Sequence, residues 1–261
     1  MEEVGQGYLK ELISRCMVQL VDKDEFATVT AVVVHDRLHA FAQEEAQEAC
    51  FVESHDSTDV LAPATVRRLA VQNTTDRHVH LGNALPKLRT IVCDFASGGA
   101  AKPSVCIHST DLGFLHASKF LRVIDIHGLE LKKLPDELGS MIHIRYLGLQ
   151  CGQLERLPST ISKLGERLEF GDGAFRSLQK LRLGLPDLEE WAVSAGSMAA
   201  LARLTLLRCA KMEMLPEALG GMKELEEVVL YSMPKMVGRI KEDGGQDHHK
   251  IKHVPVIQTI W

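Results

Sequence analysis

Residues 144–149 read Ile144-Arg145-Tyr146-Leu147-Gly148-Leu149, and this Leu-x-x-Leu-x-Leu phrase, in which Ile or Val can replace Leu, decides the fold. The phrase occurs four more times, at residues 121–126, 178–183, 201–206 and 225–230. Its first positions follow one another at intervals of 23, 34, 23 and 24 residues. A phrase that recurs at a near-constant interval indicates an internal repeat in which each copy buries the same apolar positions.

A period of about 20–29 residues with this phrase is the signature of leucine-rich repeats. One such repeat cannot bury its apolar face alone, so neighbouring copies must stack. We therefore predict an α/β fold dominated by a leucine-rich-repeat solenoid, a horseshoe with one parallel strand per phrase, over residues 61–238. Two weaker phrases begin at Val66 and Leu88, and a Leu-Pro pair follows three of the strands, at Leu134, Leu157 and Leu215.

Two intervals are too long for one repeat. Residues 95–119 form a longer connection before Leu121, and the 34-residue step from Ile144 to Leu178 contains about half a repeat more than its neighbours. We interpret residues 165–175 as a bulged loop or as a scar where repeats are missing. Because this segment offers little to bury, we expect local opening to concentrate there.

Residues 1–60 do not follow the repeat. Tyr8, Leu9, Leu12 and Ile13 fall on one face of a helix, residues 17–21 and 28–34 are β-branched runs, and a second helix follows with an apolar side. Helix, hairpin and helix predict a partial winged-helix unit. Within it, Val34-His35-Asp36 leads into the second helix, and we interpret Asp36 as the residue that caps it.

The last segment, residues 239–261, is polar and then apolar. A terminal repeat needs a polar outer surface, because nothing stacks beyond it. We predict a flexible polar tail that caps the array, with four apolar side chains covering its end: Val254, Val256, Ile257 and Trp261.

Residues that alternate with the buried phrase positions should point to the concave face, which is the usual binding surface of a solenoid. Lys180, Arg182 and Arg203 make a modest basic patch there, which is also compatible with ordinary scatter of charge on a solvated face. The polar and aromatic candidates for partner binding are Asp125, His127, Tyr146, Gln150, Lys180, Arg182, Arg203, Thr205, Glu227 and Tyr231.

Composition excludes several classes. With a net charge of −5 and 5% aromatic residues, the 261-residue chain gives no reason to expect a nucleic-acid partner. The longest apolar run is far too short to span a membrane, and no signal peptide precedes it, so we expect a cytoplasmic protein. No catalytic motif or phosphate loop is present, which predicts a protein that is not an enzyme. His35 with His39, and His248 with His249 and His253, lack a convincing set of further ligands, so we predict no metal site.

Several of these segments together resemble the nucleotide-binding leucine-rich-repeat disease-resistance proteins of plants, of the coiled-coil type. The stretch Tyr8–Arg15 resembles the winged-helix segment of that family, and Val34-His35-Asp36 stands where its members carry Met-His-Asp. Residues 66–69 and 120–125 resemble the phrases that open its repeats. Residues 239–255 are similar to the characteristic ending of the family, which identifies the chain as a C-terminal fragment of such a receptor.

The resemblance implies a role for two residues and for the repeats. His35 and Asp36 match positions that help to hold ADP in the resting receptor, so ADP or ATP is the cofactor of full-length relatives. For this chain alone we expect no cofactor, because the phosphate loop is missing. The repeats would act in pathogen recognition and autoinhibition, contacting a pathogen effector, a guarded host protein or the nucleotide-binding core of a receptor.

Two other functions remain open at the level of sequence. A leucine-rich-repeat protein can recruit substrates to a ubiquitin ligase, for which an F-box-like helical segment should precede the repeats, but residues 1–50 are predicted to form helix, hairpin and helix. A general signalling scaffold would have uniform repeats, which the long steps before Leu121 and Leu178 contradict.

Overall fold

The computed structural model describes residues 2–23, 29–55, 59–60, 62–72, 80–81, 84–94, 105–107, 117–133, 138–156, 161–164, 167–194, 196–241 and 244–261. The chain divides into two compact units, Met1–Val52 and Glu53–Trp261. The Leu-Pro pairs at Leu134 and Leu157, and most of the long connection before Leu121, lie outside the described residues.

The first unit consists of helix α1 (Glu2–Ser14), an antiparallel hairpin of β1 (Val18–Lys23) and β2 (Val29–Val34), and helix α2 (Asp36–Glu48). The predicted order of helix, hairpin and helix is therefore confirmed. Its apolar side chains are largely uncovered: Tyr8 is 65% exposed, Phe41 is 57% exposed, and α2 buries none of its residues. Among the described side chains of this unit only Val18 is buried.

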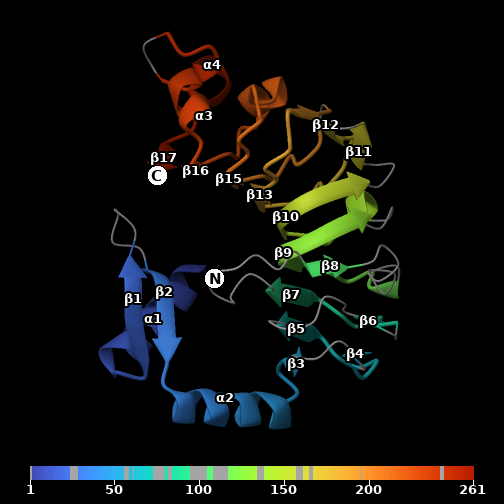
Figure 1. Ribbon diagram of the computed structural model, residues 1–261, viewed down its shortest axis with the longest axis vertical. Coiled ribbons are helices and arrows are strands. Elements are labelled where there is room, and N and C mark those ends of the chain that lie inside the picture. Colours follow the sequence, from blue (N-terminus) through green and yellow to red (C-terminus); the bar gives the residue numbers. More distant parts are fainter. Residues whose placement is uncertain are drawn as a thin grey trace. The chain divides into compact units, whose positions relative to one another are not determined.

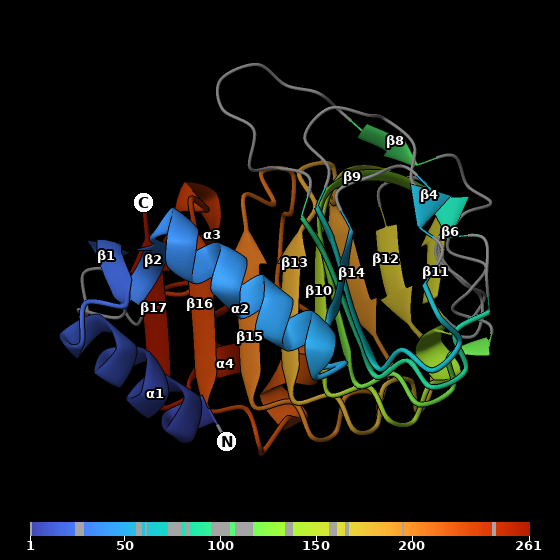
Figure 2. The same ribbon diagram turned by 90° about the horizontal axis from the view of Figure 1, so that it is seen from below.

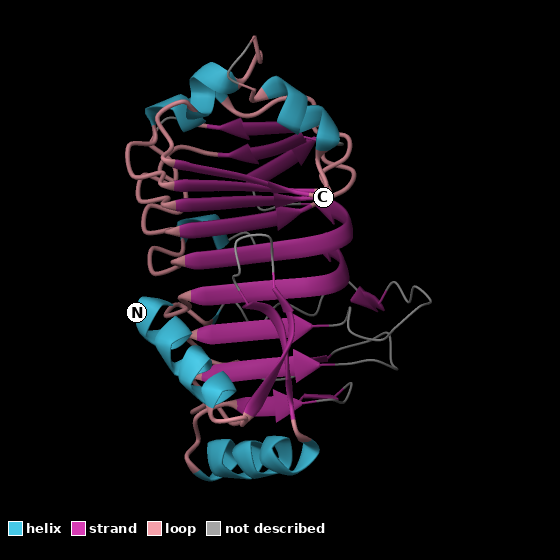
Figure 3. Ribbon diagram, turned by 90° about the vertical axis from the view of Figure 1, so that its left-hand side faces the viewer, coloured by secondary structure: helices cyan, strands magenta, loops and turns pink. Residues whose placement is uncertain are grey.

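The second unit is built on a ten-stranded sheet in which all neighbouring strands are parallel (Figures 1 and 3). This confirms the predicted mixed α/β class with a parallel sheet. The sheet follows chain order, except that β8 (Val105–Ile107) pairs with the far end of β9. Its other strands are β3 (Glu53–His55), β5 (Arg68–Gln72), β7 (Thr90–Asp94), β9 (Val123–Lys133), β10 (Tyr146–Arg156), β13 (Lys180–Gly184), β15 (Arg203–Leu207), β16 (Glu227–Tyr231) and β17 (Val256–Ile260).

The strands are aligned so that equivalent positions of each phrase lie opposite one another. Leu147 of β10 is paired with Ile124 of β9 and with Leu181 of β13. The phrase leucines are removed from solvent: Leu147, Leu204 and Leu206 are 0% exposed and Leu149 is 4% exposed. The predicted register of these strands is thus confirmed, and each phrase contributes two or three side chains to a single continuous core.

Each of these strands is entered through the same turn. The backbone N–H of the first phrase residue donates to the carbonyl three residues earlier, as from Leu178 to Phe175 and from Leu201 to Met198. From Leu85 onward the side chain at that earlier position is also buried, whereas Pro63, before Val66, is exposed. Ser118, the polar residue at this position, donates its hydroxyl to the carbonyl of Leu85 at 2.9 Å. The repeated unit is therefore a buried turn followed by a strand, and its regularity extends beyond the phrase itself.

The expectation that residues 165–175 offer little to bury is wrong. The sheet continues directly from β10 to β13, and the extra residues form β11 (Ile161–Leu164) and β12 (Arg167–Phe170). With β14 (Glu190–Val193) these make a small second sheet, visible beside the large one in Figure 2. Phe170 is 1% exposed and meets the rings of Phe175 and Trp191 edge to face. The segment is therefore a packed part of the core, because three aromatic side chains fill the space between the two sheets.

A second pair of short strands, β4 (Asp59–Val60) and β6 (His80–Leu81), lies outside the large sheet. Two short 3-10 helices, η2 (Leu138–Ser140) and η3 (Glu217–Gly221), occupy connections between strands.

The C-terminal segment differs from the predicted flexible tail. It forms helices α3 (Pro234–Arg239) and α4 (His248–Ile251) and then β17, which is the last strand of the large sheet. Of the four side chains expected to cover the apolar end, only Val254 is buried, at 6% exposure. Val256, Ile257 and Trp261 are 43%, 38% and 71% exposed. The reason is that β17 extends the sheet as an edge strand, whereas the sequence suggested a segment that covers the apolar end.

Truncating a phrase leucine should destabilise the second unit strongly. We expect Leu204→Ala to lower the free energy of unfolding by about 2–5 kcal/mol, since the side chain is fully buried and its neighbours on both strands can relax only partly. Chemical denaturation followed by circular dichroism measures this difference. Thr205→Ser, one residue away on the other side of the strand, is the control and should change stability by less than about 0.5 kcal/mol. Equal effects of the two substitutions would contradict the register.

Candidate interaction surface

The residues that alternate with the buried phrase positions form one surface of the large sheet, here called the open face. Strand register places them in rows that run across β9, β10, β13, β15 and β16. The first row contains Val123, Tyr146, Lys180, Arg203 and Glu227, and the second contains Asp125, Gly148, Arg182, Thr205 and Val229. In the third, His127, Gln150 and Gly184 adjoin on one side, and Leu207 and Tyr231 are paired further along. All ten candidate residues lie in these rows.

The first cluster on the open face surrounds Asp125. The Nε2 of His127 donates to Oδ1 of Asp125 at 2.7 Å. Burial, and next the negative charge of Asp125, raise the pKa of Tyr146, while Arg182 acts in the opposite direction. The Tyr146 hydroxyl therefore lies between a carboxylate and a guanidinium group, and it links β9 to β13 across β10.

A glycine stands at the centre of this cluster. A Cβ atom at Gly148 would overlap Oδ1 of Asp125, so the carboxylate lies in the space that a side chain there would take. The same arrangement occurs on the next strand, β13, where a Cβ atom at Gly184 would lie 2.9 Å from Cγ of Gln150. The side chains of Asp125 and Gln150 thus lie across the neighbouring strand, so the strands themselves shape the open face.

The second cluster contains the cations of the predicted basic patch. Lys180 and Arg203 are opposite each other on β13 and β15, and Arg203 forms an ion pair with Glu227 of β16. Burial, and next the charge of Arg203, lower the pKa of Lys180, although Glu227 raises it. The patch is therefore two neighbouring cations followed by an anion across three strands, and Lys180 and Arg182 lie two residues apart on β13, the strand next to that of Tyr146.

His35 and Asp36 lie in the first unit, at the junction of β2 and α2. The residue that caps α2 is His35, whose Nδ1 accepts a hydrogen bond from the backbone N–H of Arg37 at 3.4 Å. The expectation that Asp36 is the cap is wrong, because the helix begins one residue earlier than its side chain requires and Asp36 stands in the first turn. There its negative charge still favours the helix N-terminus.

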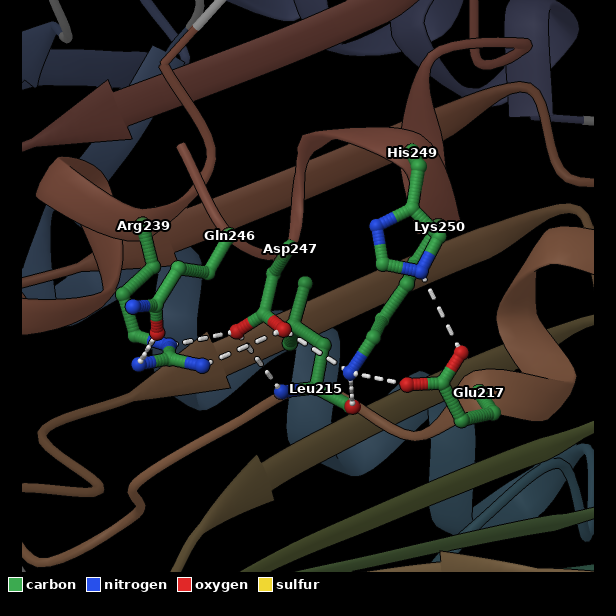
Figure 4. Close-up of polar contacts among 7 residues, drawn as sticks. All are labelled: Leu215, Glu217, Arg239, Gln246, Asp247, His249 and Lys250. Atoms are coloured by element: carbon green, nitrogen blue, oxygen red, sulfur yellow. Dashed lines mark hydrogen bonds and ion pairs between the residues drawn. The ribbon is translucent and has the colours of Figure 1, made fainter. Parts of the chain in front are cut away.

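A cluster of charged residues that the sequence did not predict fixes the C-terminal helices (Figure 4). Asp247, 1% exposed, accepts hydrogen bonds from Nε of Arg239 at 2.6 Å and from the backbone N–H of Leu215 at 3.3 Å. Lys250, 3% exposed, donates its Nζ to the carbonyl of Leu215 at 2.7 Å and lies 2.8 Å from Asp247. Both backbone groups of Leu215 are thereby satisfied by side chains from beyond the last phrase.

Hydrogen bonds within this cluster set the protonation states of Asp247 and Lys250. Burial opposes the charge on Asp247, but the hydrogen bonds from Arg239 and Lys250 outweigh it and the pKa of Asp247 is lowered. Burial likewise opposes the charge on Lys250, and the hydrogen bonds to Asp247 and Glu217 outweigh it and raise its pKa. The pair is therefore charged over the whole neutral range. The i, i+3 spacing of Asp247 and Lys250 is the one local signal that could have indicated this pair, and it carries no information about Arg239 or Leu215.

The three histidines near the C-terminus each contact an acceptor within the protein. The ring of His248 donates to the carbonyl of Ile240 at 3.1 Å and that of His253 to the carbonyl of Met222 at 3.0 Å, while His249 lies 3.3 Å from Glu217. Within the described parts of the chain, no group of three or more His, Cys, Asp or Glu side chains is arranged to hold a metal ion. In those same parts, no helix is both long and apolar enough to cross a membrane.

Comparison with known proteins shows what the chain is similar to. Residues 1–42 match the family of the disease resistance protein winged helix domain. This confirms the resemblance to the nucleotide-binding leucine-rich-repeat disease-resistance proteins of plants, to which the chain is related by sequence.

Three relatives come from Arabidopsis thaliana. The probable disease resistance protein At1g59620 is 32% identical over 150 residues, which cover 50% of this chain and 17% of that protein. The probable disease resistance RPP8-like protein 4 is 31% identical over 47% of this chain and 13% of its own length. The disease resistance protein RPP8 is 29% identical over 51% of this chain and 16% of its own length. The matched part of this chain thus spans less than a fifth of each relative.

Removing one partner of the C-terminal cluster should leave a buried charge without its counterion. We expect Lys250→Met to lower the free energy of unfolding by about 3 kcal/mol, measured by urea denaturation at neutral pH. Lys252→Met, two residues further and exposed, is the matched control and should have little effect. Similar losses in both variants would show that Lys250 is not held by the cluster.

Asp247 and Lys250 should make the free energy of unfolding depend on pH in opposite directions. Because the pKa of Asp247 is lowered on folding, its contribution is present above about pH 3.9 and is lost as the pH falls through the folded pKa. Because the pKa of Lys250 is raised, its contribution is present below about pH 10.4 and is lost as the pH rises through the folded pKa. Asp247→Asn should reduce the dependence of the free energy of unfolding on pH at acid pH, and Lys250→Met should reduce it at alkaline pH.

Proposed function

We propose that this chain provides the recognition and autoinhibition surface of a plant immune receptor. In this proposal residues 1–60 are a winged-helix segment, residues 61–238 a leucine-rich-repeat solenoid, and residues 239–261 its C-terminal cap. The observation that carries the proposal is the large parallel sheet, in which phrases about 23 residues apart bury the same positions and expose a continuous row of polar side chains. A sheet of this kind holds exposed groups at fixed spacing, as a recognition surface requires.

The open face is the proposed site of binding to other proteins: a pathogen effector, a guarded host protein or the nucleotide-binding core of the receptor. Its character suits binding rather than catalysis. Charges alternate from Asp125 to Arg182 and from Arg203 to Glu227, and Tyr146 and Tyr231 add amphipathic rings. Surfaces of this composition, rich in Arg and Tyr, are typical of protein interfaces. The relatives are named as disease resistance proteins, which supports a defence role. The cytoplasm is the proposed location.

His35 and Asp36 have a proposed role only within a complete nucleotide-binding domain, where they would help to hold ADP in the resting state. Both lie at the junction of β2 and α2, where their side chains are exposed and adjacent in the chain.

The open-face proposal is tested by binding in trans. The part of RPP8 outside its segment aligned with this chain supplies the partner, and co-precipitation with the purified chain measures the interaction. We expect Lys180→Glu combined with Arg182→Glu to reduce binding at least tenfold, because two cations on one strand are reversed.

The matched control is Lys223→Glu combined with Lys235→Glu, which makes the same change of charge in exposed residues outside the strands. Unfolding curves of both variants should coincide with that of the unchanged protein. Loss of binding in both pairs, or in neither, would reject the open face as the recognition surface.

A second prediction concerns nucleotide. For the chain by itself we expect no magnesium-dependent binding of ADP in calorimetry, because a phosphate needs clustered backbone N–H groups and usually a lysine, and the sequence has no phosphate loop. Micromolar binding of ADP that becomes weaker in the Asp36→Ala variant would contradict this and would assign a nucleotide site to the first unit.

A further inference from the structure

Strand β17 ends the large sheet with one edge unpaired. It pairs with β16 on one side, and no strand in the described ranges pairs with its other side. The N–H of Val256 and the carbonyl of Ile260 form hydrogen bonds with the residues that flank β16, at 3.1 and 2.7 Å. Since successive residues of a strand direct their backbone groups to alternate edges, those of Ile257 and Thr259 point to the free edge. This edge therefore presents an N–H and a carbonyl from each of two residues.

The edge of β17 carries little of what usually prevents pairing between sheets. Residues 254–261 contain no Asp, Glu, Lys, Arg or His. Val256, Ile257 and Trp261 are exposed apolar side chains on or beside the strand. Sheet edges are usually kept from pairing by charged side chains, bulges, prolines or very short strands. The one proline, Pro255, precedes the strand and leaves its whole length open to a partner.

The opposite end of the sheet is protected. Strand β3 has three residues, and within it Glu53 lies 3.4 Å from the ring of His55. A short strand with a charged side chain is a poor template for pairing. Pairing of β17 with β3 of another copy would also leave a free edge at each end and continue without limit, whereas pairing of β17 with β17 closes after two copies. The difference between the two edges therefore favours a closed dimer.

We propose that β17 pairs in antiparallel orientation with β17 of a second copy of this chain, about a two-fold axis. In an antiparallel pair, the residues that exchange both hydrogen bonds must each direct their backbone groups to the shared edge. Placing Ile257 opposite Thr259 of the second copy meets this condition. The same register sets Val256 against Ile260 and Gln258 against its own copy, so apolar side chains meet apolar ones and amide meets amide.

The two neighbouring registers fit less well. A pairing centred on Ile257 sets Thr259 opposite Pro255, which has no N–H to donate. A pairing centred on Thr259 sets the amide of Gln258 against the apolar side chain of Ile260. The register centred on Gln258 is therefore the one in which β17 is complementary to itself.

The pairing is small and stands apart from the open-face proposal. One strand from each copy, with the side chains beside it, buries less than the roughly 1,200 Å² of stable complexes. We therefore expect a reversible dimer with a dissociation constant of about 10–100 µM. It uses the edge of β17 and neither Lys180 nor Arg182, so it does not rest on the recognition proposed there.

Sedimentation equilibrium of the purified full chain measures the pairing. Between about 1 and 500 µM, the average mass should rise from that of one copy towards that of two and no further. Thr259→Pro removes the N–H that faces the second copy and spares the bonds to β16, so self-association should weaken at least about tenfold. Thr259→Val keeps this N–H and is the matched control, and it should change the affinity by less than about twofold.

A charge at Gln258 tests the register. Gln258→Lys should weaken self-association about fivefold at low salt, and so should Gln258→Glu, because like charges would lie directly opposite each other. Mixing the two variants should restore pairing, since an ammonium group then faces a carboxylate. The same two changes at Gln179, exposed directly before β13, are the matched control and should leave the affinity unchanged. Neither glutamine is buried, so the unfolding midpoint should stay the same in all four variants.

A monomer at every concentration, pairing that survives Thr259→Pro, or an equal loss in the Gln179 variants would overturn the proposal. Species larger than a dimer would also overturn it, because a two-fold pairing closes. If the chain stays monomeric but binds an added valine-rich peptide, and Thr259→Pro abolishes that binding, the edge belongs to a strand of another protein. No measurement here involves the partner of the open face, so failure of the dimer and failure of the proposed recognition are distinguishable.

Discussion

The second unit depends on one constraint, which is that equivalent apolar residues of successive phrases must lie opposite one another on parallel strands. When Leu147 is placed between Ile124 and Leu181, every other phrase position is placed with it, because side chains alternate along a strand and a shift by one residue would expose the whole set. The turn that enters each strand adds one more buried side chain per repeat, such as Met198 before Leu201. The open face is a consequence of this alignment, because the residues between the buried ones must point to the opposite surface of the sheet.

The same constraint explains how charged groups are organised on the surface. Residues of equal rank in their phrases become neighbours about 4.8 Å apart, although they are separated by more than twenty positions in the sequence. Arg89, Arg122 and Arg145, which each follow the first residue of a phrase, therefore lie in a row, and Arg203 forms an ion pair with Glu227 on the next strand. The repeat converts a local preference at one position into an extended surface, and substitutions from one repeat to the next, such as Gly148 and Gly184, give that surface its relief.

A stack of repeats must also end, and here polar chemistry takes over from apolar packing. Asp247 and Lys250 reach back to the backbone of Leu215, whose N–H and carbonyl would otherwise face the end of the core without partners. Burying charges in this way is tolerable because each is paired and hydrogen-bonded. The first unit contrasts with this arrangement, since α2 buries none of its residues and Val18 alone is buried among the side chains described there.

The sequence by itself determined the strands, their register and the residues of the open face, because the spacing of Leu121, Ile144, Leu178, Leu201 and Leu225 leaves one way to bury them together. It also determined the helix, hairpin and helix of the first unit from local periodicity. Only the tertiary structure decided the fate of the irregular segments. Phe170 is apolar in any conformation, but its burial against Phe175 and Trp191 depends on a second sheet in which β12 pairs with β14, a strand that begins 20 residues after β12 ends. The same holds for Asp247, whose buried charge is acceptable only because Arg239, Lys250 and the distant Leu215 converge on it, and no local pattern records such a convergence.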